Sequence, residues 1–420
     1  MTGGSLLIYA PVPLHRGADG GLWVERQAAN GLRLWAAHFA RVVAMMPLDP
    51  SPPPPGWVPV AQVGAALDRV RLEPLPAAWR PDRFLRHWRP TARRIRALIA
   101  EADHLSFAIG GLWGDWGAVA AFEASRMGRP FAVWTDRVES EVTRATAASG
   151  PWRARLRARA THRPMAWLER AVIRRAALGL FHGQETYDAY APFCRGHAEV
   201  VHDVHIARED HIAPEALAAK AAGTAEGPLR LAYVGRMEAM KGPLDWVEVV
   251  GRLKGRGVEV RALWLGDGSL RGEVAARVEA LGLKGVVEMP GFTDNRTAVL
   301  AALRDAHGFL FCHATPESPR CLIEALASGT PILGYRSAFP EDLIAGNGGG
   351  ALVGRGDVEG LAGVVDGLAR DRERLGRLIL AAARDGARFT DEAVFRHRSE
   401  VILRHLPAGG AGGAAGVAAT

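Results

Sequence analysis

Lysine and cysteine are scarce in this chain of 420 residues. Of its 52 lysines and arginines only four are lysines, which leaves 48 arginines. The three cysteines, Cys194, Cys312 and Cys321, are odd in number and widely spaced, so they form neither a disulfide framework nor a zinc-binding pattern. We expect all three to be reduced, with Cys321 lining a site.

Long apolar runs are also missing. No segment approaches the ~20 uncharged apolar residues that a membrane-spanning helix requires. The chain begins without a basic region ahead of a long apolar stretch, and this predicts a cytoplasmic protein. Clustered aspartates of the kind that hold Mg²⁺ are absent as well, so we expect no metal site.

The remaining composition is that of a globular protein with an anionic partner. Apolar residues make up 48% of the chain, enough for the cores of two or three domains. The net charge of +7 favours a partner such as nucleic acid, anionic lipid or the phosphates of a substrate. Composition does not choose among these three.

Short apolar runs alternate with helical patterns of about ten to fifteen residues. This alternation predicts α/β architecture with doubly wound parallel sheets, whose ligands bind at the carboxyl ends of the strands. In the first half we expect strands near 6–9, 41–46, 70–72, 105–109, 131–134, 178–181 and 199–202. In the second half we expect them near 229–234, 258–265, 286–289, 307–312, 331–334 and 351–353.

The stretch 315–331 carries the strongest local signal. Ser318 is a good N-cap and Pro319 suits the first helical position, so a helix of about three turns should begin at Ser318 and stop near Gly329. A helix start after a buried strand attracts phosphate. Glu317 and Glu324 lie about two turns apart and could both face the hydroxyls of one ligand, although they could equally be ordinary surface glutamates.

Two cations follow another strand end. The run Leu231–Val234 leads into Gly235 and Arg236, and Lys241 precedes a helix expected over 243–254. Two fixed positive charges over a strand end suit a diphosphate group, whereas the simpler alternative is a solvated turn.

These motifs resemble the donor site of the family 4 retaining glycosyltransferases of GT-B fold. The resemblance is specific over roughly 229–335 and weaker before it. It rests on four segments in the family's order, Val234-Gly235-Arg236-Met237 with Lys241-Gly242, Leu265-Gly266-Asp267-Gly268, Pro290-Gly291-Phe292-Thr293, and Glu324 through Pro331.

The resemblance implies two Rossmann-like domains facing across a cleft, and transfer of a hexosyl group from a UDP- or GDP-sugar with retention and no required cofactor. It assigns Arg236 and Lys241 to the leaving diphosphate, Glu317 to the transferred sugar and Glu324 to the ribose. It also places further residues around the donor, namely Gly266, Phe292, Thr293, Gly20 and Gly21.

Two departures from the family pattern stand out. Glu317 and Glu324 enclose six residues where the family has seven, and a Gly-Phe-Gly segment is replaced. The phosphate would then be held by the amides of Arg320, Cys321 or Leu322, helped by the Ser318 hydroxyl and the Arg320 guanidinium. Asp136 stands near the position of a family histidine and is a candidate for acceptor binding, or else a plain turn residue.

The domain boundaries follow from these patterns. We expect a Rossmann-like acceptor domain over 1–205, a linker over 206–228 and a donor domain over 229–388. By resemblance, 389–406 is a terminal helix that returns to the first domain. The Gly- and Ala-rich tail 407–420 is expected to be disordered.

A basic stretch from Trp152 to Arg175 has its own signature. Between 153 and 175 it holds eight arginines and a single acidic residue, Glu169, with tryptophans interleaved. This composition suits a helix at an anionic membrane surface, and would also suit nucleic acid or a merely solvated helix. Family members with lipid-linked acceptors often carry such a patch, which favours the membrane.

The sequence therefore predicts a bacterial glycosyltransferase that acts in cell-envelope or exopolysaccharide synthesis, on a glycan or a lipid-linked acceptor, as a cytoplasmic or peripheral membrane enzyme. The altered glutamate spacing and the missing histidine favour an alternative, a catalytically impaired binding protein of the same fold. A nucleic-acid-binding protein is a weaker alternative, because the basic stretch contains no recognisable nucleic-acid module. We therefore expect no nucleic-acid partner.

Overall fold

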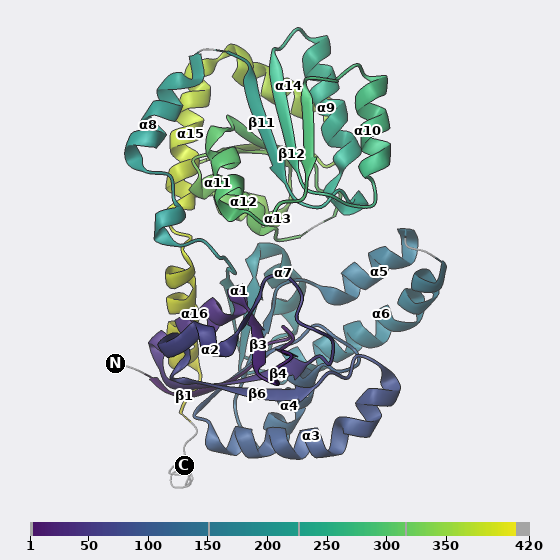
Figure 1. Cartoon of the computed structure of the whole chain (residues 1–420), viewed down its shortest axis with the longest axis vertical. Helices are drawn as coiled ribbons and strands as arrows, with labels where there is room; N and C mark the ends of the chain where they lie inside the picture. The colour runs from purple at the N-terminus through teal and green to yellow at the C-terminus, as the bar shows by residue number, and fades with distance from the viewer. Residues whose placement is uncertain (1–2, 150–151, 226, 316, 409–420) are drawn as a thin grey trace. The chain divides into compact units, whose positions relative to one another are not determined.

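The computed structural model describes residues 3–149, 152–225, 227–315 and 317–408. The chain divides into two compact units, the first made of Met1–Asp203 with Asp391–Thr420 and the second of Val204–Thr390. Both are α/β units (Figure 1). Residues 409–420 of the expected disordered tail lie outside the described residues.

The first unit is built on a seven-stranded sheet in the order β10-β9-β8-β7-β1-β4-β6, in which all the pairings are parallel. Its strands are β1 (Gly3–Tyr9), β4 (Phe39–Leu48), β6 (Val70–Pro76), β7 (His104–Ala108), β8 (Ala132–Thr135), β9 (Leu178–His182) and β10 (His197–Val201). Its main helices are α1 (Arg26–His38), α3 (Pro81–Glu101), α4 (Trp116–Arg126), α5 (Glu139–Ser149), α6 (Trp152–Ile173), α7 (Gly183–Tyr190) and α16 (Asp391–His405).

Alternation along β1 supplies two cores. Leu7 and Tyr9 belong to one buried cluster, whereas Leu6 and Ile8 belong to another. Successive side chains of a strand point to opposite faces, so a strand covered on both faces is apolar throughout. This explains why the strand positions of the first unit could be predicted from short apolar runs.

A small antiparallel sheet corrects one expectation. The sequence from about Leu22 to Phe39 has a helical pattern and predicts one helix there. Helix α1 begins only at Arg26, because β3 (Leu22–Glu25) pairs with β2 (His15–Arg16) and with β5 (Trp57–Pro59). Backbone pairing to these neighbours fixes the first four residues in an extended conformation. A sequence-local helix pattern carries no information about such partners.

The second unit contains a six-stranded sheet in the order β13-β12-β11-β14-β15-β16, with parallel pairings. Its strands are β11 (Leu229–Val234), β12 (Val260–Leu265), β13 (Val287–Gly291), β14 (Gly308–Phe311), β15 (Ile332–Tyr335) and β16 (Gly350–Val353). Its helices include α8 (Pro214–Ala222), α9 (Pro243–Gly255), α10 (Arg271–Ala280), α11 (Arg296–Asp305), α12 (Arg320–Ala327), α13 (Ala338–Ile344), α14 (Val358–Arg370) and α15 (Arg372–Gly386).

The strand order reverses between β11 and β14. Strands added after β11 run outward through β12 and β13, and the chain then returns to place β14 on the other side of β11. In an open parallel sheet, the loops at the carboxyl ends diverge at such a point and leave room for a ligand. The loops after β11 and β14 are therefore the first place to look for a site.

The segment 206–228, expected to be a linker, carries structure of its own. It contains α8 and the short helices η3 (Arg208–Asp210) and η4 (Gly223–Ala225), and α8 packs on α15 within the second unit. Lys220 on α8 donates to Thr330 Oγ1 at 2.7 Å and to the Ser328 carbonyl at 3.2 Å. The alanine-rich composition that resembled a linker is that of a helix packed closely on its neighbour.

Among the described residues, no helix is both long and apolar enough to cross a membrane. Helix α16 packs on α1 within the first unit, where Asn30 donates to Asp391 Oδ2 at 2.7 Å.

Candidate functional site

A glycine turn places Lys241 at the carboxyl end of β11. Gly242 has φ of +61°, and a Cβ atom there would lie 1.9 Å from the carbonyl oxygen of Cys312, just after β14. Glycine is required both for the left-handed backbone and for this close approach. The amide of Ala314 donates to the Met240 carbonyl at 2.9 Å, so the loops after β11 and β14 are joined.

Lys241 forms an ion pair with Glu317. Nζ lies 2.6 Å from Oε2, and the two side chains are only 11% and 16% exposed. In such a partly buried pair, each charge offsets the cost of removing the other from water. The structure thus brings together two residues that the sequence placed on different loops.

A buried histidine and tyrosine, which sequence reasoning missed, continue this network. His313 Nδ1 lies 3.7 Å from Glu317 Oε1, and His313 Nε2 is 2.9 Å from the hydroxyl of Tyr233 on β11. Burial, and then the charge of Lys241, lower the pKa of His313 well below its usual value, so the ring is neutral. Both residues stand at carboxyl strand ends, a signal that could have identified them.

Cys321 lies near both glutamates. Burial raises the pKa of its thiol to about 12; Lys241 opposes this shift, whereas Glu324 and Glu317 add to it. These influences require all three charged groups to be close to the thiol. A thiol with so high a pKa stays protonated at neutral pH, so Cys321 can line the site but is a poor nucleophile.

Glu324 pairs with an arginine that was not predicted. Arg296 Nη1 donates to Glu324 Oε1 at 3.1 Å, and Arg296 Nη2 donates to Asp210 Oδ2 at 2.9 Å. Burial raises the pKa of Glu324, and Arg296 is the strongest opposing influence. No motif marks Arg296 or Asp210; only their position beside strand-end loops could have drawn attention to them.

The N-cap of helix α12 lies one residue later than expected. Pro319, not Ser318, is the N-cap, with ψ of 125° in the extended range, and Arg320 is the first helical residue. Of the three amides expected to hold phosphate, that of Leu322 already donates to the Pro319 carbonyl at 3.2 Å. The amides of Arg320 and Cys321 are the better candidates.

Arg236 lies in the loop after β11 with an exposed side chain. Burial, Cys321 and Glu317 raise the pKa of Tyr233, whereas Arg236 lowers it, so the guanidinium acts on the same tyrosine as the Glu317 carboxylate. It forms no ion pair with the described part of the chain. An exposed, uncompensated guanidinium beside a strand end suits an anionic ligand.

The ends of β12 and β13 complete this edge of the sheet. A Cβ atom on Gly266 would lie 1.9 Å from the Gly235 carbonyl oxygen, so glycine lets the two loops touch. Phe292 is 77% exposed, an unusual setting for a phenyl ring. Thr293 Oγ1 accepts from the Asn295 amide at 3.2 Å.

The predicted residues of the first unit are less distinctive. Gly20, with φ of +79°, and Gly21 form the turn between β2 and β3, and their amides already donate to the Gly17 carbonyl and to Asp19 Oδ1. Asp136 follows β8 and is partly buried. Burial raises the pKa of the nearby Glu139, and Asp136 contributes to that shift.

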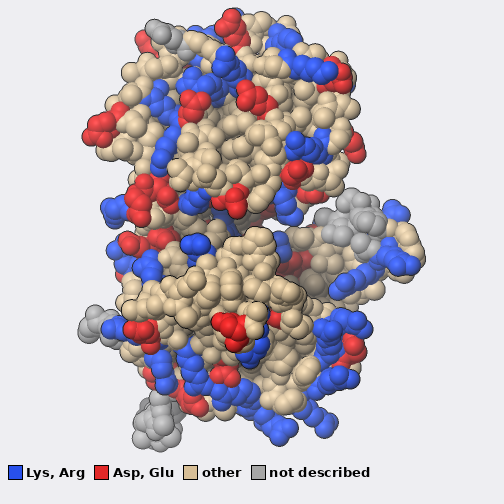
Figure 2. Space-filling view, viewed as in Figure 1, with Lys and Arg blue, Asp and Glu red and all other residues tan. Residues whose placement is uncertain are grey.

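Most of the basic stretch from Trp152 to Arg175 forms α6, which ends at Ile173 and packs on α5. Figure 2 shows Lys and Arg side chains gathered over these two helices. Trp152 and Trp167 are 65% and 68% exposed, and Leu156 is exposed as well. The single acidic residue, Glu169, is buried and accepts from the Ser140 amide and hydroxyl, so it does not offset the arginines at the surface.

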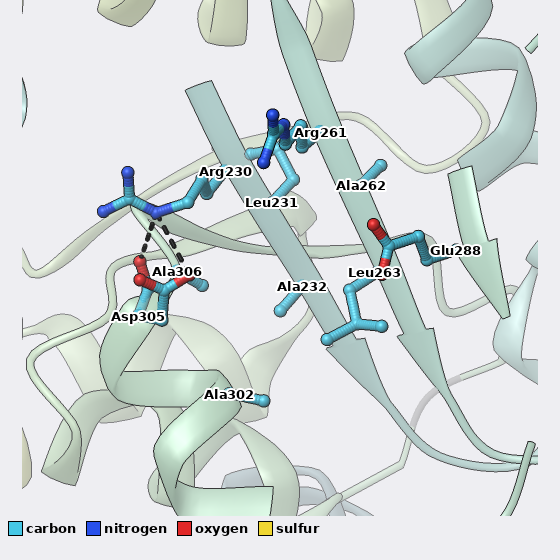
Figure 3. Close-up of a pocket in the computed structure, with 10 residues that line it drawn as sticks. All are labelled: Arg230, Leu231, Ala232, Arg261, Ala262, Leu263, Glu288, Ala302, Asp305 and Ala306. Carbon is cyan, nitrogen blue, oxygen red and sulfur yellow. Dashed lines mark hydrogen bonds and ion pairs between the residues drawn. The ribbon is translucent and has the colours of Figure 1, made fainter. Parts of the chain in front are cut away.

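A separate cavity of about 160 Å³ in the second unit involves none of the predicted site residues (Figure 3). It opens where the alanines of β11, β12 and α11 leave space between helix and sheet. Arg230 at its rim donates to the Asp305 carbonyl at 2.9 Å. No group of three or more His, Cys, Asp or Glu side chains that could hold a metal ion occurs within the described residues.

Comparison with known proteins agrees with the geometry. Residues 216–385 match the family described as Glycosyl transferases group 1. The putative colanic acid biosynthesis glycosyltransferase WcaL of Salmonella typhimurium is 32% identical over 184 residues, which cover 42% of this chain and 45% of that protein. The chain thus spans less than half the length of this relative.

Two solved structures resemble the whole chain. The lipopolysaccharide outer core galactosyltransferase WaaB in its apo form has a TM-score of 0.65 at 16% identity, and covers 96% of this chain and 100% of that chain. Anabaena Alr3699/HepE in complex with UDP has a TM-score of 0.64 at 15% identity, with the same coverage. At this identity the likeness concerns the fold, and it confirms the predicted fold of two parallel α/β sheets.

Proposed function

We propose that this chain, whose residues 216–385 match the group 1 glycosyl transferase family and whose fold is GT-B, is a retaining glycosyltransferase of the hexosyl type. It uses a UDP- or GDP-sugar as donor and a glycan or lipid-linked acceptor, in cell-envelope or exopolysaccharide synthesis. Its relatives include proteins named for colanic acid and lipopolysaccharide synthesis, and a structural neighbour holds UDP.

One observation carries this proposal. Lys241, Glu317, Cys321 and Glu324 come together at the carboxyl ends of β11 and β14, where the strand order of the second unit reverses. An ammonium and two carboxylates at such a point match the needs of a nucleoside diphosphate sugar, which presents phosphates and hydroxyls side by side. A ligand with phosphates alone would not need the carboxylates, and a ligand with hydroxyls alone would not need the ammonium.

The chemistry then follows from charge placement. Arg236, Lys241 and the first amides of α12 hold the diphosphate and stabilise the negative charge that grows on it as the glycosidic bond breaks. Glu317 holds the sugar, Glu324 the ribose, and Phe292 with Thr293 and Gly266 borders the base. The acceptor oxygen bonds to the anomeric carbon, and the departing phosphate oxygen takes the acceptor's proton.

A second candidate is a donor-binding protein with impaired transfer. Glu317 is ion-paired to Lys241, so one charged group of the site neutralises another. Binding without turnover would favour this candidate. In both cases Asp136 of the first unit is the candidate for acceptor binding, and Gly20 and Gly21 are candidates for contacts with the donor.

Binding to an anionic membrane surface is the third part of the proposal. The exposed Trp152, Leu156 and Trp167 supply apolar contacts at headgroup depth, and the arginines of α6 supply charge. A peripheral position at the cytoplasmic face would bring the enzyme to a lipid-linked acceptor. We expect the protein to co-sediment with anionic but not with neutral liposomes. The double variant Trp152→Ala/Trp167→Ala should lose this co-sedimentation. Steeply salt-dependent binding to a nucleic-acid duplex, without liposome binding, would overturn this assignment.

The donor assignment is tested by thermal stability in the presence of UDP, GDP and a panel of their sugars. A ligand that binds only the folded state raises the melting temperature by mass action. We expect at least one nucleoside diphosphate to do so, and Lys241→Met to abolish the shift. Lys254→Met is the matched control, because Lys254 is an exposed lysine of the same unit that donates to the Gly282 carbonyl.

Turnover separates the two candidates. Release of nucleoside diphosphate from the stabilising sugar nucleotide, in the presence of an envelope lipid extract, is expected for the transferase. Stabilisation by sugar nucleotides without release would support the impaired binding protein, and stabilisation by none of them would refute both.

A further inference from the structure

The guanidinium of Arg296 is held between two carboxylates. Asp210 Oδ2 accepts from Nη2 at 2.9 Å and from Nε at 3.2 Å, and Glu324 Oε1 accepts from Nη1 at 3.1 Å. Two edges of the planar group are therefore used, and its orientation is fixed. The three side chains are 37%, 22% and 18% exposed for Arg296, Asp210 and Glu324, so water screens these contacts only in part.

The backbone places both ends of this bridge. Arg296 is the first residue of α11, and the side chain of Asn295 caps that helix by accepting from the Ala298 amide at 3.1 Å. Asp210 ends the short helix η3, where its Oδ2 also accepts from the Ala207 amide at 3.0 Å. The carbonyl of Asp210 accepts from Arg304 Nη2 at 2.8 Å, so this aspartate is anchored at both its backbone and its side chain.

Glu324 needs such a partner. Burial raises the pKa of its carboxyl; Arg296 and Arg320 oppose the shift, and Asp210 adds to it. Within the described residues its second oxygen, Oε2, makes no hydrogen bond. One oxygen is thus fixed by Arg296, and the other is left to accept a hydrogen bond from a ligand.

We propose that Arg296, held by Asp210, is a positioning residue that fixes Glu324 toward the ribose hydroxyls of the donor. This inference rests on the proposed function and deepens it, because the selectivity for a ribonucleoside then depends on a residue that touches no part of the ribose. It also assigns a role to the segment that leads from the first unit into the second, since Asp210 lies within 206–228.

The test compares ribonucleotides with deoxyribonucleotides in calorimetric titrations of the full chain with UDP, GDP and their 2′-deoxy and 3′-deoxy forms. Wild type is expected to bind the ribonucleotide about tenfold more tightly than at least one deoxy form, the size expected for one hydrogen bond to a charged group. Arg296→Met should reduce this ratio to about twofold or less, with affinity for the deoxy form changed less than about threefold. Arg296→Lys should restore part of the ratio.

Arg277→Met is the matched control, because Arg277 pairs with Glu248 between α10 and α9, away from the strand ends. It should keep the wild-type ratio. As the pH is lowered, Arg296→Met should also lose affinity for the ribonucleotide at a higher pH than wild type does. In this variant the Glu324 carboxylate lacks the main cation that keeps it charged. A role in folding alone would move neither the ratio nor the pH profile.

The outcomes separate this inference from the proposal beneath it. If wild type binds neither UDP nor GDP, the proposed function fails, and the role of Arg296 fails with it. If wild type binds and Arg296→Met loses affinity equally for ribo and deoxy forms, Arg296 contacts phosphate or base directly and only this inference is overturned. An unchanged ratio at wild-type affinity overturns it as well.

Discussion

Replacing Glu317 with glutamine should strengthen the binding of a nucleoside diphosphate. In the unliganded chain, the ammonium of Lys241 lies 2.6 Å from the Glu317 carboxylate, so a phosphate must compete with that carboxylate for the same cation. Glutamine keeps the size and shape of the side chain but removes its charge. The competition and the repulsion between carboxylate and phosphate are then both relieved.

The expected gain is moderate. A hydrogen bond to a charged group contributes about 1.5–3 kcal/mol, and the Lys241 ammonium already engages one such partner before the ligand arrives. Recovering part of that interaction gives about 1–2 kcal/mol, or about five- to thirtyfold in affinity. Lys241→Met should act in the opposite direction, with a loss of about tenfold or more, because the phosphate loses its cation and the Glu317 carboxylate loses the ammonium that offsets its charge.

Calorimetric titration with UDP and GDP measures both changes, and unfolding in urea measures the stability of each variant. Each single substitution should lower the free energy of unfolding by about 1–3 kcal/mol, since each leaves one partner of the pair without the other. Despite this shared cost in stability, the two variants should differ in the sign of their effect on affinity. Turnover of the sugar nucleotide should fall in Glu317→Gln, because the sugar loses its carboxylate.

A weaker affinity in Glu317→Gln would refute this reasoning. It would mean that Glu317 holds Lys241 in the orientation that phosphate needs, and that the ion pair is part of the bound state rather than its competitor.

Three further predictions follow from single residues. Gly242→Ala should lower the free energy of unfolding in urea by more than about 2 kcal/mol, because φ is +61° and an added Cβ atom would lie 1.9 Å from the Cys312 carbonyl oxygen. An unfolding midpoint equal to that of wild type would contradict this account of the turn. Phe292→Ala should weaken nucleotide binding by about 1–3 kcal/mol in the same titrations if the 77% exposed ring stacks on a base, and an unchanged affinity would remove Phe292 from the site. Burial lowers the pKa of Lys220 to about 7, so above pH 7 the unfolded chain binds more protons than the folded chain, and the free energy of unfolding rises with pH. In Lys220→Met this rise should be flatter by up to about 1.4 kcal/mol per pH unit between pH 7 and 10. If urea titrations of wild type and variant gave parallel curves against pH, Lys220 would stay charged in the folded protein.

The strands were predictable from the sequence because both faces of each main sheet are covered. A strand buried on both faces is a short, continuous apolar run, as in β14 and β15, in which every residue is buried. The elements that depend on a partner were not predictable in the same way. Leu22–Glu25 reads as the start of a helix until β2 and β5 are in place beside it.

The residues of the candidate site also differ in how well the sequence predicts them. Lys241, Glu317, Cys321 and Glu324 could be grouped from the sequence because each lies after a strand or in the helix that follows it, within segments that resemble the family's motifs. The residues that orient them come from elsewhere in the chain. Asp210 lies in a segment that resembled a linker, and no motif marks either Asp210 or Arg296, so their roles arise only from contacts made by folding.

The scarcity of lysine offers a last physical argument about the site. The chain has 48 arginines, so an enclosed lysine side chain indicates a site that a guanidinium does not fit. Two of the four lysines are largely enclosed. Lys220 directs its ammonium at Thr330 Oγ1 and at the Ser328 and Leu303 carbonyls, and Lys241 is enclosed beside Glu317. A compact ammonium with three rotatable donors suits such a small, rounded space, whereas the flat fork of arginine needs width and a planar partner. The space around Arg296 is wide enough for its planar group, which bridges the carboxylates of Asp210 and Glu324. The choice between lysine and arginine at these positions therefore reflects the shape of each place, one suited to a compact point charge and the other to a rigid bridge between two carboxylates.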